Sequence, residues 1–313
     1  MPGEPIISVI IVNFNGGPFL TECVCSVLAS TVPVAVYVVD NASGDDSLLT
    51  LTSTIKRDER VQIIQNPKNL GFARAANLAL PYTTGHYLLF LNPDCLIYPD
   101  TLARFVSVMD KYPQAGMAGA LVRNPDGSEQ AGCRRSVPTP WRTLVRVFHL
   151  DKLFPHSKYV QNFVLTQKPL PDKPIEIEGI SGACMFVRRT ALEMVGPMDE
   201  TYFLHCEDLD WFMRFQAQKW PILFIPEIEI VHIKGACSRE QPLRILWYKH
   251  RGMVRFYRKF FRHQYSPPLF WMVIVAVWIR FTLLSLITLI FAKKTPNKIP
   301  FFSSDVLKKP RDH

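Results

Sequence analysis

Polar and acidic residues directly follow three apolar runs in the first third of the chain. They are Asn13 after residues 6–12, Asp40 and Asn41 after residues 34–39, and Asn92 and Asp94 after residues 86–91. Ligands of open α/β sheets bind beyond the carboxyl ends of the strands, so we expect these side chains to share one pocket. A carboxylate placed there is well suited to holding a divalent cation. Each residue alone could simply end a strand or cap a helix, but the convergence of three strand ends favours the pocket.

Two later features fit the same pocket. Glu207, Asp208 and Asp210 place three carboxylates near the start of a predicted helix. Such a cluster can complement the helix dipole, and it can also supply a general base beside a ligand. His232 ends another strand-like stretch. A lone histidine is more often structural than a ligand, although imidazole is also a common metal ligand.

The apolar runs alternate with segments of helical spacing. Strands are predicted at residues 6–12, 34–39, 61–64, 86–91, 184–188 and 222–225, and helices at residues 19–29, 71–80 and 209–218. The last of these strands is expected to end before Pro226. This alternation predicts an α/β fold in which helices flank a sheet.

Composition and missing motifs exclude several classes of protein. The chain has 313 residues, 48% hydrophobic and 20% charged, which argues against a disordered or fibrous protein. Its seven cysteines contain no CxxC pair, so we expect a reducing cytoplasm rather than a disulfide framework or a zinc ribbon. No GxGxxG follows the first strand and no GxxxxGK[ST] phosphate loop occurs, which excludes the usual dinucleotide-binding and P-loop fingerprints.

The C-terminal quarter carries the whole excess of basic residues in a chain of net charge +9. Residues 249–263 interleave basic and aromatic side chains, and residues 269–292 contain only one charge, Arg280. That apolar run is long enough to span a membrane, whereas Arg280 and the basic flanks also permit a re-entrant hairpin or an interfacial helix, which we favour. We therefore expect an anionic membrane surface as a partner and no nucleic acid.

Several short motifs occur in order between residues 6 and 235. They are Ile10–Gly16 (IIVNFNG), Val38–Ser43 (VVDNAS), Asn69–Ala73 (NLGFA), Phe90–Asp94 (FLNPD) and the pair Glu207-Asp208. Together they resemble the family 2 inverting glycosyltransferases of the GT-A fold, in particular their bacterial rhamnosyltransferase-like branch. The resemblance implies a GT-A nucleotide-sugar-binding sheet flanked by helices. It also implies a catalytic domain at 1–235, a basic-aromatic segment at 236–265, a membrane-associating segment at 266–292 and a basic tail at 293–313.

The resemblance also implies a role for each matching residue. The nucleotide-sugar contacts would be Asn13, Asp40, Asn41, Arg74 and Asn92. Asp94 and His232 match the metal ligands of the family, for Mg²⁺ or Mn²⁺, although Asn92 replaces the first acid of the usual DXD motif. Asp208 matches the catalytic base and Glu207 is its neighbour in the catalytic pair.

The expected activity is transfer of a sugar from a nucleotide donor to a hydroxyl of a lipid-linked or polysaccharide acceptor. The resemblance favours dTDP-rhamnose as donor and O-antigen or related cell-surface glycan synthesis, at the cytoplasmic face of the inner membrane. A UDP-hexose or UDP-galactofuranose donor is the first alternative. A non-catalytic nucleotide-sugar-binding membrane protein and a cationic adaptor whose α/β domain is only a scaffold are the others.

Overall fold

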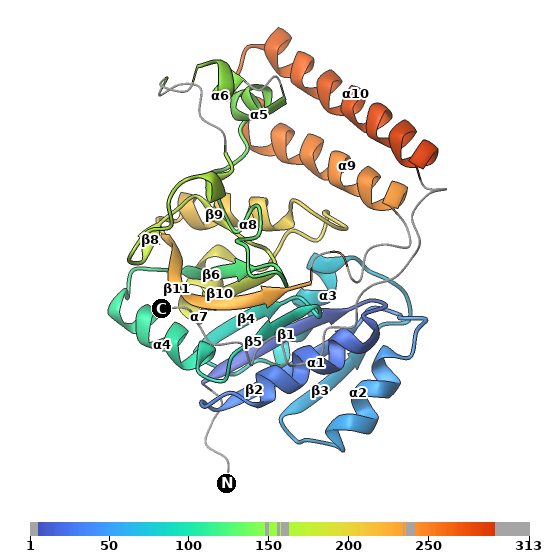
Figure 1. The fold of residues 1–313 in the computed structure, drawn as a ribbon, viewed down its shortest axis with the longest axis vertical. Coiled ribbons are helices and arrows are strands. Elements are labelled where there is room, and N and C mark those ends of the chain that lie inside the picture. Colours follow the sequence, from blue (N-terminus) through green and yellow to red (C-terminus); the bar gives the residue numbers. More distant parts are fainter. Residues whose placement is uncertain are drawn as a thin grey trace.

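The protein was analysed as a computed structural model, which describes residues 6–147, 150–154, 157, 163–233, 235 and 242–291. The expected basic tail at 293–313 and the first residues of the basic-aromatic segment, 236–241, lie outside the described residues. Figure 1 shows an α/β body with two long C-terminal helices lying side by side at one end of it. The predicted fold class is confirmed.

One mixed sheet forms the centre of the body, in the order β3-β2-β1-β4-β10-β6-β11-β5, with β8 paired to β11. Its strands are β1 (Ile7–Asn13), β2 (Val34–Asp40), β3 (Val61–Gln65), β4 (Tyr87–Leu91), β5 (Cys95–Ile97), β6 (Met117–Arg123), β8 (Ile175–Glu176), β10 (Cys184–Arg188) and β11 (Ile222–His232). Strands β3, β2, β1 and β4 are parallel, whereas β10 runs antiparallel to β4. A separate two-stranded sheet pairs β7 (Arg134–Arg135) with β9 (Gly179–Ile180).

Helices cover the sheet and extend the chain beyond it. They are α1 (Gly17–Leu28), α2 (Ser47–Ile55), α3 (Phe72–Ala79), α4 (Thr101–Lys111), α5 (Pro140–Val147), α6 (Leu150–Leu153), α7 (Arg189–Val195), α8 (Glu207–Ala217), α9 (Pro242–Phe260) and α10 (Pro267–Phe291). In Figure 1, α1 and α2 lie in front of the sheet and α3 lies behind it. Every residue of β1 is buried because both faces of the strand are covered, as its continuous apolar run predicts.

The prediction that a strand ends before Pro226 is wrong. Strand β11 continues through Pro226 to His232, with a register shift against β6 between Ile225 and Glu229. On its other side β11 pairs with β8 at residues 223–224 and with β5 at residues 230–232. The proline therefore lies where one side of the strand has no partner, which is where a sheet tolerates proline. The extension brings His232 opposite Cys95, next to Asp94.

The C-terminal helices form a hairpin in which one face of α10 packs on α9. Phe270, Val273, Ile274 and Val277 of α10 are buried, whereas Leu283 and other apolar residues of the helix are about half exposed. Residues 267–290 have a mean hydropathy of 2.4, and 17% of the most apolar window is buried. Helix α10 is one continuous helix over Pro267–Phe291, so this segment does not itself form the re-entrant hairpin that was one of the expected arrangements.

Arg280 joins α10 to α9 through His250. Nη1 of Arg280 lies 3.0 Å from Nε2 of His250, and Nδ1 of His250 lies 2.7 Å from the carbonyl oxygen of Leu246. A carbonyl only accepts and a guanidinium only donates, so Nδ1 carries the proton and Nε2 accepts, which requires a neutral imidazole. Burial, together with the nearby charges of Arg280 and Lys249, lowers the pKa of His250.

We expect the α9–α10 contact to weaken in acid. A histidine with a lowered pKa in the fold is protonated more readily in the unfolded chain, so its contribution is present above pH 6.5 and is lost as the pH falls below it. The thermal unfolding midpoint of the wild type in detergent should fall more between pH 7.5 and 5.5 than that of His250→Gln. The exposed His86 provides the control, since His86→Gln should follow the wild type. Equal slopes for all three proteins would contradict this role of His250.

Candidate active site

The ends of β1 and β2 are joined by the amide of Asn13. Its Nδ2 donates to Oδ1 of Asp40 at 2.8 Å and lies within 3.0 Å of the hydroxyls of Ser43 and Ser47. Oδ1 of Asn13 is buried without a hydrogen-bond partner in the described structure. A Cβ at Gly16 would lie 2.4 Å from that oxygen, so only glycine fits beside it. The structure thus brings Asn13 and Asp40 together at the sheet edge, with Oδ1 of Asn13 buried beneath Gly16.

Asn41 is fully engaged by the protein itself. Its Nδ2 donates to Oδ1 of Asn69 at 2.9 Å and to the carbonyl of Gly71 at 3.2 Å. Its Oδ1 accepts from the Nδ2 of Asn66 and from the backbone N–H of Leu70. An asparagine amide has these four positions to offer, so Asn41 holds the loop before α3 rather than presenting a free group to a ligand.

The other two residues predicted to contact the nucleotide sugar, Asn92 and Arg74, differ in how far they are exposed to solvent. Asn92 is half-buried between β4 and β5, and its backbone N–H donates to the carbonyl of Ala183 at 2.9 Å. Arg74 is exposed on α3, and its Nε lies 3.6 Å from Oε2 of Glu200. Neither contact brings the side chain to Asp94, so the structure does not gather these residues as closely as Asn13 and Asp40.

Asp94 and His232 meet where β5 pairs with the end of β11. Both are buried, and Oδ1 of Asp94 lies 3.1 Å from Nε2 of His232. The sulfur of Cys95 completes a cluster whose ligand atoms lie within 4.8 Å of one another. Cys95 donates to the carbonyl of Ala183, and burial raises the pKa of its thiol. The carboxylate of Asp94 is the hard oxygen ligand of the cluster, the kind that Mg²⁺ and Mn²⁺ prefer, and His232 adds an imidazole nitrogen of borderline softness.

Gln130 fixes the orientation of the His232 ring. Its Nε2 donates to the carbonyl of His232 at 3.1 Å and to Oδ1 of Asn124 at 2.9 Å, so its Oε1, 2.7 Å from Nδ1, must accept from the ring. Nδ1 then carries the proton, and the lone pair of Nε2 faces the carboxylate of Asp94. Oδ1 of Asp94 has no hydrogen-bond donor in the described structure. Two acceptors in contact require a positive charge between them, either an added proton or a metal ion, so the residues fit a divalent cation.

The three carboxylates at the start of α8 lie in different surroundings. Asp210 is fully buried and pairs with Arg214 at 2.9 Å and with Lys259 at 2.6 Å, so it is a structural ion-pair partner. Glu207 is buried, and this burial, reinforced by the charge of Asp208, raises the pKa of its carboxyl. Glu207 is therefore held near its neutral form. Asp208 keeps a partly exposed side chain, which leaves it as the accessible anionic carboxylate of the three.

Asp208 is held against Arg135 of β7. Nη2 of Arg135 contacts Oδ2 of Asp208, and Arg135 also lies 5.8 Å from the ring of Phe212. A Cβ at Gly182 would come within 2.9 Å of the same carboxylate oxygen, so a larger residue there would displace the side chain of Asp208. The sequence shows residues 130–150 as arginine-rich and free of acids, but no spacing rule links Arg135 to Asp208. Arg135 and Gln130 are the site residues that sequence reasoning missed.

The loop that leads into α8 is clamped between two glycines. His205 and Cys206 have φ angles of 68° and 72°, which cost roughly 1–2 kcal/mol each for residues with a Cβ. A Cβ at Gly252 of α9 would lie 2.8 Å from the carbonyl oxygen of His205. On the other side, a Cβ at Gly71 would lie 2.4 Å from the carbonyl oxygen of Phe203. Close backbone packing therefore stabilises the strained turn that presents Glu207 and Asp208.

The comparisons with known proteins identify the class to which this fold and site belong. Residues 8–196 match the model of the family described as Glycosyl transferase family 2, and the chain belongs to that family. It is a glycosyltransferase with a GT-A fold, and the family implies an inverting mechanism.

Relatives and solved structures agree with this membership. An N-acetylglucosaminyl-diphospho-decaprenol L-rhamnosyltransferase of Mycobacterium tuberculosis is 26% identical over 278 residues, covering 85% of this chain and 88% of its own. A mannosyltransferase of Pyrobaculum calidifontis, solved with GDP-Man and Mn²⁺, has a TM-score of 0.58 at 17% identity, over 94% of this chain and 77% of its own. GalNAc-T7, solved with UDP, GalNAc and Mn²⁺, has a TM-score of 0.58 at 18% identity, over 82% and 48%. These two structures show the fold.

Asp94→Asn should abolish tight Mn²⁺ binding without harming the fold. Loss of a second-shell partner alone costs about 10–100-fold in metal affinity, so loss of the ligand should cost at least that much. Gln130→Leu, which frees the His232 ring, should fall between Asp94→Asn and the wild type. Mn²⁺ titration followed by electron paramagnetic resonance measures the affinity directly.

The exposed Asp172 supplies the control, and Asp172→Asn should bind Mn²⁺ as the wild type does. Without metal, the unfolding midpoint of Asp94→Asn should equal or exceed that of the wild type, because a buried carboxylate oxygen without a donor is removed. Unchanged Mn²⁺ affinity in Asp94→Asn would exclude this cluster as the metal site.

Proposed function

We propose that this glycosyltransferase is a metal-dependent L-rhamnosyltransferase that uses dTDP-rhamnose and a lipid-linked acceptor in bacterial cell-surface glycan synthesis. The observation that carries the reaction type is the pairing of a buried, donor-free Asp94 oxygen with the lone pair of His232, on the same sheet edge as Asn13 and Asp40. The choice of sugar and acceptor is supported by the mycobacterial relative, an N-acetylglucosaminyl-diphospho-decaprenol L-rhamnosyltransferase that aligns along 85% of this chain.

Asn13 and Asp40 form the donor side of the proposed site. Asn13 is fully buried and positions the carboxylate of Asp40, which can accept a hydrogen bond from a ribose hydroxyl. Asn41 acts on this side indirectly, because it holds residues 66–71 in place at the start of α3. Arg74 is proposed to approach the diphosphate when the donor is bound, exchanging its exposed contact with Glu200 for the ligand.

Asp94 and His232 would hold the divalent cation, with Asn92 as a neighbouring polar group. When bound, the ion neutralises the charge that develops on the departing nucleoside diphosphate. The protein supplies the orientation of this site: Gln130 fixes the tautomer of His232, and burial excludes water from Asp94.

Asp208 is proposed as the general base. An acceptor hydroxyl is a poor nucleophile near neutral pH, so a carboxylate must take its proton as the bond to the anomeric carbon forms. Asp208 is the partly exposed anion of its cluster, and Arg135 orients it. Attack opposite the leaving group inverts the anomeric configuration, and no covalent sugar–enzyme intermediate is needed. Glu207, held near its neutral form, is proposed to support α8 rather than to accept the proton.

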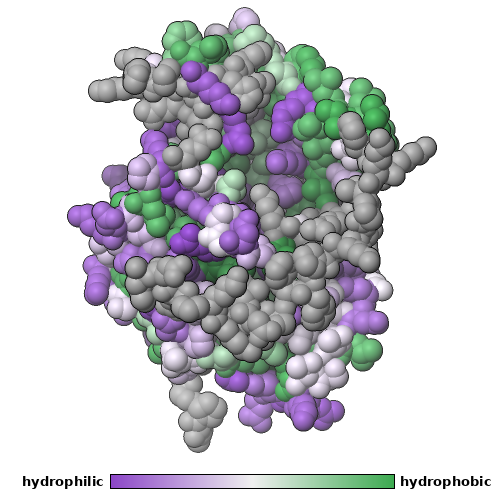
Figure 2. Space-filling model, in the orientation of Figure 1, coloured by the Kyte–Doolittle hydropathy of each residue, from purple (hydrophilic) through white to green (hydrophobic). Residues whose placement is uncertain are grey.

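The α9–α10 hairpin is proposed to hold the enzyme at the cytoplasmic face of the inner membrane. Figure 2 shows hydrophobic residues gathered along the upper right of the molecule, where Figure 1 places α10. One side of α10 packs on the basic helix α9, and its other side is apolar and exposed. An interfacial α10 would place this apolar face in the lipid and the basic residues of α9 near the anionic headgroups. Basic residues near an anionic surface add about 1 kcal/mol each.

A panel of nucleotide sugars tests the donor assignment. Release of nucleoside diphosphate is measured for dTDP-rhamnose, a UDP-hexose and UDP-galactofuranose, each with Mn²⁺ and with EDTA. We expect Mn²⁺-dependent release from dTDP-rhamnose, accelerated by a lipid-diphosphate-linked N-acetylglucosamine acceptor. Release from a UDP-sugar alone would replace the donor assignment, and release that ignores EDTA would remove the metal from the proposal.

Asp208→Asn should lose turnover by about 10²–10⁴-fold, the usual cost of removing a general base. Donor binding should change less than about tenfold, because Asp208 acts on the acceptor. Glu207→Gln is the matched comparison: it replaces a carboxyl that is already near neutral, so most of the activity should remain. Single-turnover transfer rates and nucleotide titrations separate the two effects. A stronger loss in Glu207→Gln than in Asp208→Asn would reverse the two roles.

Membrane binding should depend on the exposed face of α10. Leu283 and Leu286 are 55% and 52% exposed, so a Leu283→Glu/Leu286→Glu double variant should fold normally. Two carboxylates on that face should move the protein from sedimenting anionic liposomes to the supernatant, because charges are costly in lipid. Leu49→Glu on α2, where Leu49 is 68% exposed, is the control and should remain bound. Full retention of the double variant on liposomes would contradict an interfacial α10.

A further inference from the structure

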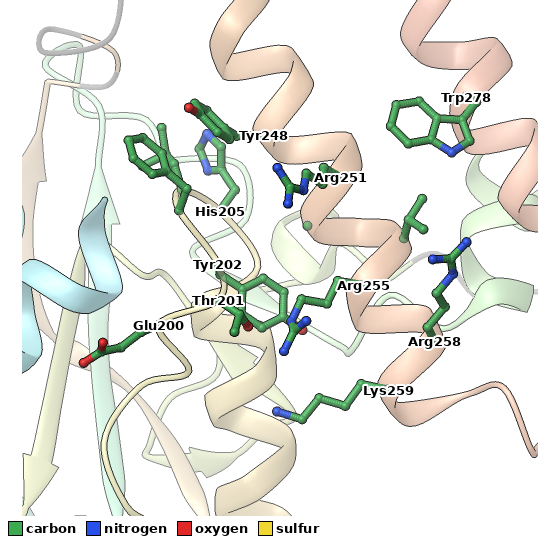
Figure 3. Close-up of a pocket in the computed structure, with 14 residues that line it drawn as sticks. Glu200, Thr201, Tyr202, His205, Tyr248, Arg251, Arg255, Arg258, Lys259 and Trp278 are labelled. Atoms are coloured by element: carbon green, nitrogen blue, oxygen red, sulfur yellow. The ribbon is translucent and has the colours of Figure 1, made fainter. Parts of the chain in front are cut away.

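A cavity of about 980 Å³ opens between the loop before α8 and the C-terminal hairpin. Its walls are residues 200–205 of the loop, one face of α9, and Trp278 of α10. Figure 3 shows Arg251 and Arg255 extending from α9 toward the loop, and Arg258 extending toward the side of α10. The nucleotide-sugar site proposed above uses none of these residues.

The cavity carries a strong positive charge. Arg251, Arg255, Arg258 and Lys259 line it, and their spacing places them on one face of α9, whereas Glu200 is the single carboxylate among the lining residues.

Two of these cations are already paired. Arg255 and Lys259 reach Asp199 at 3.4 and 2.9 Å. Arg251 and Arg258 have no carboxylate within ion-pair distance among the residues that the structure describes. Two guanidinium groups are therefore available to an anion in this cavity, and guanidinium groups bind phosphate oxygens through paired hydrogen bonds.

The cavity also connects the apolar helix with the catalytic carboxylates. Trp278 contributes an aromatic wall from α10, and the guanidinium of Arg258 lies 6.0 Å from the ring of Trp271 on the same helix. At the other end, Gly252 packs on the carbonyl of His205. Because Asp208 follows His205 by three residues, their Cα atoms are at most about 11 Å apart. Asp208 therefore follows directly on the part of the loop that forms the wall of the cavity.

We infer that this cavity binds the diphosphate of the lipid-linked acceptor, with Arg251 and Arg258 as its anion ligands. The inference rests on the proposed function, because it places the acceptor's diphosphate between the lipid and the proposed general base, Asp208. The lipid chain would leave along the exposed face of α10, and the acceptor sugar would extend toward Asp208. The three parts of such an acceptor match three neighbouring surfaces. Its apolar chain matches α10, its diphosphate matches the arginines of the cavity, and its sugar matches the side on which Asp208 lies.

A phospholipid headgroup is the competing ligand, and the geometry favours the diphosphate. Headgroups at a membrane surface are attracted by any exposed cation, including Arg262, which follows α9 and does not line the cavity. A phospholipid headgroup does not need a cavity beside residues 200–205 in order to bind to surface cations. Such a cavity does serve a ligand that must be held at a fixed distance from Asp208.

Binding of farnesyl diphosphate to the full chain in a non-ionic detergent tests the inference by calorimetry. EDTA is present, so the metal-dependent site does not contribute. Arg251→Ala and Arg258→Ala should each weaken binding about tenfold, the lower range for hydrogen bonds to charged groups. Arg251→Lys should lose less, because it keeps the charge. The matched control Arg262→Ala should bind as the wild type does, and farnesol, which has the same chain without phosphates, should not bind measurably.

A second arm measures binding to phosphatidylglycerol vesicles that contain no lipid diphosphate. There the Arg251, Arg258 and Arg262 variants should lose equal, small amounts. Wild-type affinity for farnesyl diphosphate in both cavity variants, or an equal loss in Arg262→Ala, would overturn the inference and leave only a cationic surface. Turnover is not measured in either arm, so a failure of the rhamnosyltransferase assignment in the donor panel remains a separate result.

Discussion

The backbone of residues 203–206 is packed so closely on both sides that α3, α8 and α9 cannot move independently. Gly71 touches the carbonyl of Phe203 and Gly252 touches that of His205, and a Cβ at either glycine would lie within 2.8 Å of a backbone oxygen. Phe72 also donates its N–H to the carbonyl of Phe203 at 2.8 Å. Helices α3, α8 and α9 therefore meet at one short loop. The close packing on both sides stabilises His205 and Cys206 in their left-handed conformations.

Position alone does not decide what each carboxylate at the start of α8 can do. Asp210 is neutralised by two cations, Glu207 is driven toward its neutral form by burial and by Asp208, and Asp208 faces Arg135 at the edge of the site. Environments that push neighbouring carboxyl groups toward different charge states are a recurrent property of catalytic sites. The surroundings thus separate one anionic, accessible carboxylate from two that support the fold.

The features that sequence predicted best are those set by local pattern. The apolar runs at residues 6–12 and 34–39 predicted two strands whose carboxyl ends meet, and the structure joins these ends through Asn13 and Asp40 as expected. Pro226 misled the prediction because its tolerance depends on which side of β11 lacks a partner, and that is a property of the assembled sheet. The effects of Gln130 on His232 and of Arg135 on Asp208 join residues 102 and 73 positions apart, and no spacing rule reaches that far.

The hairpin explains how a charged residue is accommodated in an apolar helix. The guanidinium of Arg280 donates to His250, so it is anchored to α9. Because this contact and the buried side of α10 hold the two helices together, the basic face of α9 and the apolar face of α10 keep a fixed relation. Gly252 of α9 packs directly on the carbonyl of His205, so the position of α9 also fixes the loop before α8. Under the proposed function, a membrane that binds α10 would therefore fix the orientation of Asp208 relative to the lipid surface, where a lipid-linked acceptor would present its sugar.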